Sequence, residues 1–314
     1  MNVDQLLDPE VAAALAAVPR FAELTTELLP RIRAERLRDA RVQSARLSGK
    51  VMSTDHVVAG APGDPAVTLR VYRAVDAVGA LPCVYWVHGG GYVLGTYEAE
   101  DGRFESWCRR HNCVGVAVEY RLAPETPYPG PLDDCYAGLT WVRSNAAALG
   151  IDPERIGIGG ASAGGGLAAG LALLARDRGE VPLRFQLLVY PMVDDRFGNA
   201  SHGWEVPVWP PSSNRFGWSS YLGDLFGSAD VPPYAAAARA SDLSGLPSTF
   251  ITVGTLDGFV DEDIEYATRL NHAGVPVELH VHPGAPHGFE IFAPHTAVAK
   301  RARAEIDAWL ARVI

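Results

Sequence analysis

The sequence has few of the features that mark secreted, membrane-spanning or nucleic-acid-binding proteins. Its 314 residues carry a net charge of −10 and contain no block of Lys and Arg, which argues against nucleic acid or an anionic membrane as a partner. The longest apolar run, residues 166–175, is too short to span a bilayer, and the first residues lack the basic and apolar segments of a signal peptide. We therefore expect a cytoplasmic protein without a membrane span.

Cysteine is also scarce, and its spacing excludes the common metal and redox motifs. No Cys-x-x-Cys occurs, so reduced thiols acting as small buried hydrophobic residues explain the four cysteines best. We expect no metal and no organic cofactor. The four residues are Cys83, Cys108, Cys113 and Cys135.

The composition and the order of the elements predict one large α/β domain. Apolar residues make up 48% of the chain and charged residues 20%, which is ordinary for a globular protein. Two segments, 51–59 and 67–74, alternate as an opening antiparallel pair would. Short apolar strands then alternate with helices, which predicts a mostly parallel sheet covered on both faces. These strands are expected at 83–87, 114–118, 155–159, 185–190, 249–253 and 277–281, and the helices at 98–111, 132–149, 165–178, 260–273 and 298–313.

Two regions fall outside this alternation. Residues 1–46 are expected to be helical, and the apolar residues of their first part recur at helical spacing: Leu6, Leu7, Val11, Leu15 and Val18. Pro30 interrupts a second helical segment, 21–46, so two helices with a kink are expected. Residues 194–241 form a long connection without a strand, rich in Trp and Pro, as lids and binding loops are. Its aromatic side chains either pack the insertion onto the core or line an apolar pocket.

The pentapeptide Gly160-Ala161-Ser162-Ala163-Gly164 lies between an apolar strand and an Ala- and Leu-rich helix. A Gly-x-Ser-x-Gly in that position is the nucleophile elbow, which raises one hydroxyl from the strand end in a strained backbone conformation. The flanking glycines avoid collisions with the neighbouring strand and helix. The helix that follows directs its N-terminal N–H groups toward the site.

Three further groups complete a predicted hydrolytic site at the carboxyl ends of the strands. The glycines of His88-Gly89-Gly90-Gly91-Tyr92 predict an oxyanion hole, formed by backbone N–H groups together with that of Ala163, although a flexible turn or a phosphate-binding loop is the alternative. Asp257 follows the strand 249–253, and His287 follows the strand 277–281 in a Pro- and Gly-rich loop. His can take the proton of Ser162 while a carboxylate orients it. Asp261 is the alternative acid.

The chain resembles the hormone-sensitive-lipase branch of the α/β-hydrolases, which includes many bacterial carboxylesterases. The resemblance implies an eight-stranded sheet, a helical cap built from residues 1–46 and 194–241, and a catalytic domain of residues 47–193 and 242–314. It also implies Ser162, Asp257 and His287 as the triad and Gly89, Gly90 and Ala163 as oxyanion donors. The matching residues are His88–Gly91, Tyr120–Glu125, Pro129, Asp133, Asp134, Gly160–Gly165, Asp257, Asp261, Glu262 and His287–Phe289.

We therefore expect a serine carboxylesterase acting on esters with short or medium acyl chains through an acyl-enzyme. A hydrolase of lactones, amides or carbamates, an acyltransferase with the same triad, and a non-catalytic binding protein on the same fold are the alternatives. The family usually has Asp before the nucleophile, where this chain has Ala161. A homodimer is possible at the edge of the sheet. The candidate substrate-binding residues are Tyr92, Trp204, Trp209 and Phe289.

Overall fold

One eight-stranded sheet organises the molecule in the computed structural model, which describes residues 3–17, 23–45 and 47–314. The strand order is β1-β2-β4-β3-β5-β6-β7-β8. The pairs β1–β2 and β2–β4 are antiparallel, and every later pair is parallel, as the sequence predicts. The strands are β1 (Val51–Val58), β2 (Val67–Ala74), β3 (Leu81–Val87), β4 (Val114–Glu119), β5 (Ile151–Ala161), β6 (Phe185–Val189), β7 (Ser248–Leu256) and β8 (Val277–Pro286).

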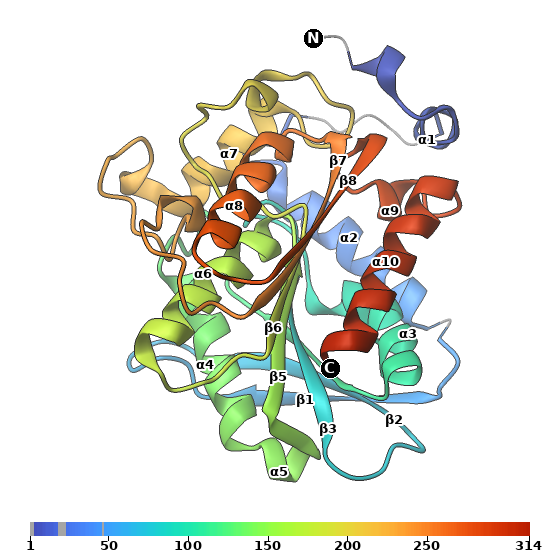
Figure 1. Ribbon diagram of the computed structural model, residues 1–314, viewed down its shortest axis with the longest axis vertical. Helices are drawn as coiled ribbons and strands as arrows, with labels where there is room; N and C mark the ends of the chain where they lie inside the picture. The colour runs from blue at the N-terminus through green and yellow to red at the C-terminus, as the bar shows by residue number, and fades with distance from the viewer. Residues whose placement is uncertain (1–2, 18–22, 46) are drawn as a thin grey trace.

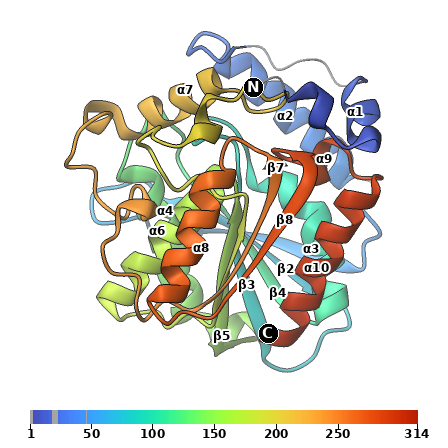
Figure 2. The ribbon, with the colours of Figure 1, turned by 45° about the horizontal axis from the view of Figure 1, so that its top comes forward.

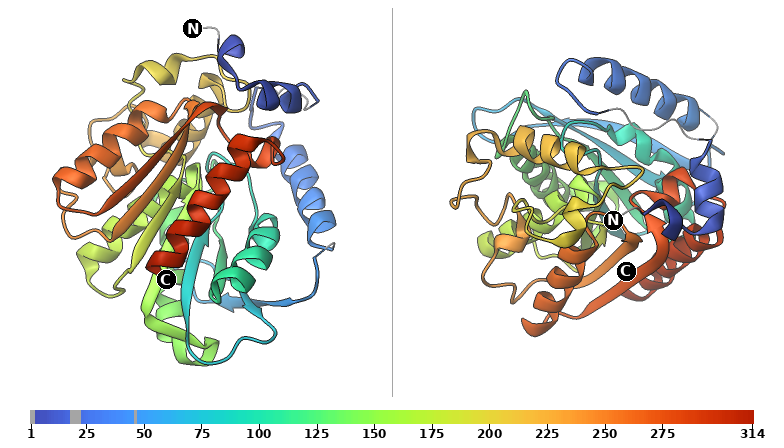
Figure 3. Two further views of the ribbon diagram at one scale, coloured as in Figure 1. Left: turned by 45° about the vertical axis from the view of Figure 1, so that its right-hand side comes forward. Right: turned by 90° about the horizontal axis from the view of Figure 1, so that it is seen from above.

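Helices cover both faces of this sheet (Figure 1). On one face lie α3 (Asp101–His111) and α10 (Ala297–Val313), and on the other lie α4 (Gly130–Ser144), α6 (Ala163–Arg178) and α8 (Val260–His272) (Figure 3). Residues of β3 alternate between the two cores, since Tyr85 packs in the cluster of α4 and α6 whereas Trp86 packs with α3. The remaining helices are α1 (Pro9–Leu15), α2 (Leu29–Ser44), α5 (Ala146–Leu149), α7 (Pro211–Leu222) and α9 (Phe289–Phe292).

The N-terminal region differs from the sequence prediction at Pro30. This residue does not kink a helix but occupies the first turn of α2, where its missing N–H costs nothing because the first N–H groups of a helix have no carbonyl partner within the helix. Residues 23–28 just before α2 are not helical. Val18 and both ends of the predicted segment 21–46 lie outside the described residues.

Short helices replace strands between β6 and β7, as expected for residues 194–241. This stretch contains α7 and the 3₁₀ turns η3 (Ala200–Gly203), η4 (Gly223–Leu225) and η5 (Ala237–Arg239). Together with α1, helix α7 lies at the end of the molecule toward which the arrowheads of β7 and β8 point (Figures 1 and 2). In the part of the chain that the structure describes, no helix is both long and apolar enough to cross a bilayer.

Candidate active site

Ser162 stands on the sharp turn between β5 and α6 in a left-handed backbone conformation, with φ 59° and ψ −124°. Such a conformation is costly for a residue with a side chain and persists only where the surroundings enforce it. A Cβ on Gly160 would lie 2.2 Å from the carbonyl oxygen of Gly164, and a Cβ on Gly164 would lie 2.2 Å from that of Val87. The two glycines therefore allow the strand and helix to meet closely enough to raise Ser162.

A chain of hydrogen bonds joins the three residues that the sequence placed at the ends of β5, β7 and β8. The distance from Ser162 Oγ to His287 Nε2 is 2.9 Å, and that from His287 Nδ1 to Asp257 Oδ2 is 2.7 Å. Asp257 is 1% exposed, His287 6% and Ser162 7%. The imidazole thus lies between an alcohol and a buried carboxylate, which fixes Nδ1 as the protonated nitrogen and leaves Nε2 free to accept the serine proton.

Asp257, and not Asp261, contacts the imidazole. The second oxygen of Asp257, Oδ1, accepts the backbone N–H of Phe259 at 3.0 Å, which holds the carboxylate at the start of α8. Asp261 Oδ2 instead accepts the backbone N–H of Ser201, in the insertion, at 2.9 Å. The alternative acid considered from the sequence is therefore engaged elsewhere.

The glycine loop after β3 lies directly against the nucleophile turn. A Cβ on Gly89 would be 2.7 Å from the carbonyl oxygen of Ala161 and 3.4 Å from Ser162 Cβ, so only glycine allows this backbone approach. Gly90 has φ +128°, which residues with side chains rarely adopt. Ala163 is the first residue of α6, so its N–H belongs to the helix end that faces the serine.

Tyr120 packs against the glycine loop at His88. Its ring stacks on that of His88 with centroids 4.2 Å apart, and its hydroxyl donates to the carbonyl oxygen of His88 at 2.9 Å. The neighbouring Ala123 N–H donates to the carbonyl oxygen of Tyr92 at 3.0 Å. The segment that follows β4 therefore fixes the glycine loop. None of these hydrogen bonds involves Ser162 or His287.

Of the four candidate substrate-binding residues, Trp209 contacts the site. Its ring would collide with a Cβ on Gly91, and its centroid lies 6.5 Å from that of His287. Tyr92 is fully buried, where it stacks on Tyr221 and donates its hydroxyl to the carbonyl oxygen of Met192. The other two lie in small apolar clusters, Trp204 beside Val206 and Leu256 and Phe289 beside Ala285 and Val11.

Three residues beside His287 escaped the sequence analysis: Tyr190, Phe259 and Glu290. The ring of Tyr190 meets the imidazole at a centroid distance of 4.5 Å, and that of Phe259 meets it edge-on at 5.1 Å. Glu290 is buried behind Tyr190 and accepts its hydroxyl hydrogen bond. Tyr190 directly follows β6, so the rule that singled out residues at carboxyl strand ends could have found it.

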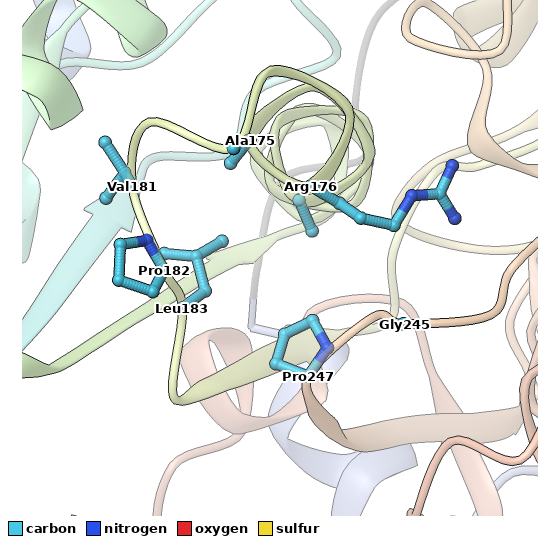
Figure 4. Close-up of a pocket in the computed structure, with 9 residues that line it drawn as sticks. Ala175, Arg176, Val181, Pro182, Leu183, Gly245 and Pro247 are labelled. Atoms are coloured by element: carbon cyan, nitrogen blue, oxygen red, sulfur yellow. The ribbon is translucent and has the colours of Figure 1, made fainter.

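Two surface cavities lie away from this site. One, of about 380 Å³, is lined by residues of the C-terminal end of α6 and the segments beside it, including Ala175, Arg176 and Pro247 (Figure 4). The nucleophile precedes the opposite end of that helix, roughly 24 Å away at the usual rise per residue. The other, of about 470 Å³, is lined mainly by α4 and the loop after β1.

A strained serine on a strand–helix turn, joined to a histidine and a buried carboxylate at the carboxyl edge of a mostly parallel sheet, defines a hydrolase of the α/β class. The comparison with known families agrees. A family model described as alpha/beta hydrolase fold matches residues 84–291. The chain belongs to this family, in its branch of hormone-sensitive-lipase type.

Characterised relatives and solved structures resemble the chain over most of its length. It is 39% identical over 241 residues to Carboxylesterase NlhH of Mycobacterium tuberculosis, covering 74% of each chain. It is 35% identical over 292 residues to Esterase LipI of Mycobacterium tuberculosis, covering 90% of this chain and 88% of the other. The structure titled Bacterial Heroin Esterase superimposes with a TM-score of 0.94 at 42% identity and covers 99% of both chains.

Proposed function

We propose that this protein is a serine carboxylesterase in which Ser162 is the nucleophile, His287 the general base and acid, and Asp257 the residue that orients His287. The carboxylic ester hydrolase activity is that of the relatives, and the hydrogen-bonded chain from Ser162 through His287 to Asp257 carries the assignment of roles. His287 takes the serine proton as Ser162 Oγ bonds to the ester carbonyl carbon. It then gives that proton to the departing alcohol, leaving an acyl-enzyme, which water hydrolyses by the same steps.

The N–H groups of Gly89, Gly90 and Ala163 would bind the oxyanion of the tetrahedral intermediate. The close approach of Gly89 to Ser162 supports this, because the carbonyl carbon of the ester must reach Ser162 Oγ while its oxygen lies within hydrogen-bond reach of the N–H donors. The positive end of the α6 dipole would stabilise the same negative charge on the oxyanion.

We infer that esters with short or medium acyl chains are the preferred substrates. Trp209 supports this, because its indole lies between Gly91 and the imidazole and narrows the space beside the reacting carbonyl. Residues 1–46 and 194–241 are proposed as a cap over a catalytic domain of residues 47–193 and 242–314. The cytoplasmic location and the homodimer also stay predictions.

The test is hydrolysis of p-nitrophenyl butyrate by the wild type, by two variants of the proposed triad and by one control variant. Ser162→Ala and Asp257→Asn should each reduce kcat by about 10⁴-fold or more, because the nucleophile is lost in one and the orienting charge in the other. Asp261→Asn is the matched control and should retain most of the activity, because Asp261 accepts the backbone N–H of Ser201 whereas Asp257 accepts the hydrogen bond of His287. Full activity of Ser162→Ala would exclude the proposed nucleophile.

A further inference from the structure

Behind the imidazole of His287 lies a second buried acid that the hydrolytic chain does not use. Glu290 is three residues beyond His287, in α9, so one short turn carries both side chains. It is 9% exposed, its Oε1 accepts the hydroxyl of Tyr190, and its buried Oε2 has no hydrogen-bond partner among the residues that the structure describes. Burying a carboxyl group with a lone pair unused is expensive, which calls for a compensating role.

Tyr190 connects this acid to the imidazole. Its ring lies against that of His287 at 4.5 Å and 61°, while its hydroxyl points to Glu290. The backbone of Tyr190 is held in the left-handed region, with φ 36°, and its N–H donates to the carbonyl oxygen of Thr252 at 2.7 Å. A tyrosine fixed at both its backbone and its hydroxyl leaves the imidazole little room to rotate away from Ser162.

Relying on the function proposed above, we propose that Glu290 is a positioning residue for His287 and acts through the Tyr190 hydroxyl. The pair holds the imidazole in line between Ser162 and Asp257. The negative charge of Glu290 also favours the imidazolium that forms when His287 takes the serine proton.

The charges around the pair fit this role. Burial raises the pKa of Glu290, while the Tyr190 hydrogen bond and the positive charge of Arg103 act against that rise. The positive charge of His287 lowers the same pKa, and because such coupling is reciprocal, ionised Glu290 stabilises protonated His287. Arg103 itself is paired with Glu100 at 2.7 Å, and the backbone oxygen of Glu290 accepts from Arg303. Asp257 faces the imidazole from the other side.

The test is the pH profile of kcat/KM for p-nitrophenyl butyrate in Glu290→Gln, Tyr190→Phe and the double variant. Glu290→Gln keeps the shape and the hydrogen bond but removes the charge, so the acid limb should move to lower pH by roughly 0.5. Tyr190→Phe keeps the ring but removes the hydroxyl that donates to Glu290, so it should shift the acid limb in the same direction. In both variants kcat should fall by about 10-fold with KM nearly unchanged, in Glu290→Gln because the charge that favours the imidazolium is lost and in Tyr190→Phe because the alignment of the imidazole is lost. The double variant should be no worse than the single ones.

Tyr136→Phe is the matched control, because it removes a similar bond, to Glu180 at 2.5 Å, beside the cavity of about 470 Å³ rather than beside the triad. Its pH profile should match the wild type. If wild type is active and Ser162→Ala is not, but both Glu290→Gln and Tyr190→Phe keep the wild-type acid limb and kcat, the positioning role is wrong while the proposed function stands. If wild type lacks esterase activity, or Ser162→Ala retains it, the function itself fails.

Discussion

At the scale of single residues, the site depends on backbone approaches that no side chain would permit. Gly89, Gly160 and Gly164 let the loop after β3, the end of β5 and the start of α6 meet around Ser162. Ala161, where the family usually has Asp, is buried in the core with α3 and β6, so packing rather than a carboxylate holds the turn on this side. The identity of the residue before the nucleophile therefore matters less here than the glycines around it.

Gly164→Ala tests this dependence. The added Cβ would lie 2.2 Å from the carbonyl oxygen of Val87 and 2.4 Å from that of His88, and both are backbone atoms that cannot rotate away. We expect a loss of about 3 kcal/mol in the free energy of unfolding by urea, together with a large loss of esterase activity because the glycine loop is displaced. Gly102→Ala, in α3 with open space around its Cβ, should stabilise the fold by roughly 0.5 kcal/mol. Equal stabilities of the two variants would refute the argument.

At the scale of elements, α2 is fastened to the loops that surround the nucleophile. Arg33 donates to the carbonyl oxygens of Val93 and Ala123 at 2.8 Å each and forms a two-pronged pair with Glu125 at 2.8 and 2.9 Å. A single side chain thus joins the N-terminal region to the end of the glycine loop and to the segment after β4. Loss of this residue should affect the loops more than the sheet.

Arg33→Met should lower kcat/KM for p-nitrophenyl butyrate by about 10-fold, because the glycine loop loses two of its restraints. The melting temperature should change little, since α2 packs outside the sheet. Arg31→Met, which removes an exposed pair to Glu35 at 3.8 Å, serves as the control and should leave kcat/KM unchanged. Equal effects of the two substitutions would show that Arg33 does not restrain the loop.

The sequence predicted these elements unevenly, and the reasons are physical. All eight strands were predicted near their observed places, because short β-branched runs alternating with helices leave few arrangements other than a parallel sheet. Ser162, Asp257 and His287 were singled out because all three follow strand ends. Pro30 was misinterpreted because proline is compatible with the first turn of a helix as well as with a kink. Arg33 was missed because its partners lie far away in the chain. Glu290 was missed because Tyr190 stands between it and His287.

At the scale of the whole molecule, a buried pair of titratable groups joins the insertion to the catalytic core. His202 in η3 bonds Glu262 in α8, and Glu262 Oε1 also accepts the N–H groups of Val193 and Asp194 at 2.7 and 3.1 Å. Burial raises the pKa of Glu262 to about 7 from its ordinary 4.5. Burial lowers the pKa of His202, but the hydrogen bond and charge of Glu262 outweigh it, so the net shift is upward. Both groups therefore bind protons more tightly in the folded chain than in the unfolded one.

This pair should make the unfolding free energy fall as the pH rises from about 4.5 past 7, because the folded state holds more protons across that window. Glu262→Gln retains an oxygen for the two N–H groups but no longer titrates, so its unfolding free energy should decline less over the same range. Urea denaturation at a series of pH values measures the difference between wild type and variant. His202→Gln should likewise reduce the decline of the unfolding free energy with pH. The same pH dependence in all three proteins would show that this pair does not cause the decline.

Finally, 125 positions separate the alcohol of Ser162 from the imidazole that activates it. During synthesis the ribosome releases β5 and α6 long before β8 and α9, so the emerging polypeptide carries a nucleophile without its base. Hydrolytic competence therefore requires that β8 has paired with β7, because His287 follows β8 and reaches Ser162 only in that arrangement. The onset of turnover in a translation reaction should therefore report when β8 joins the sheet.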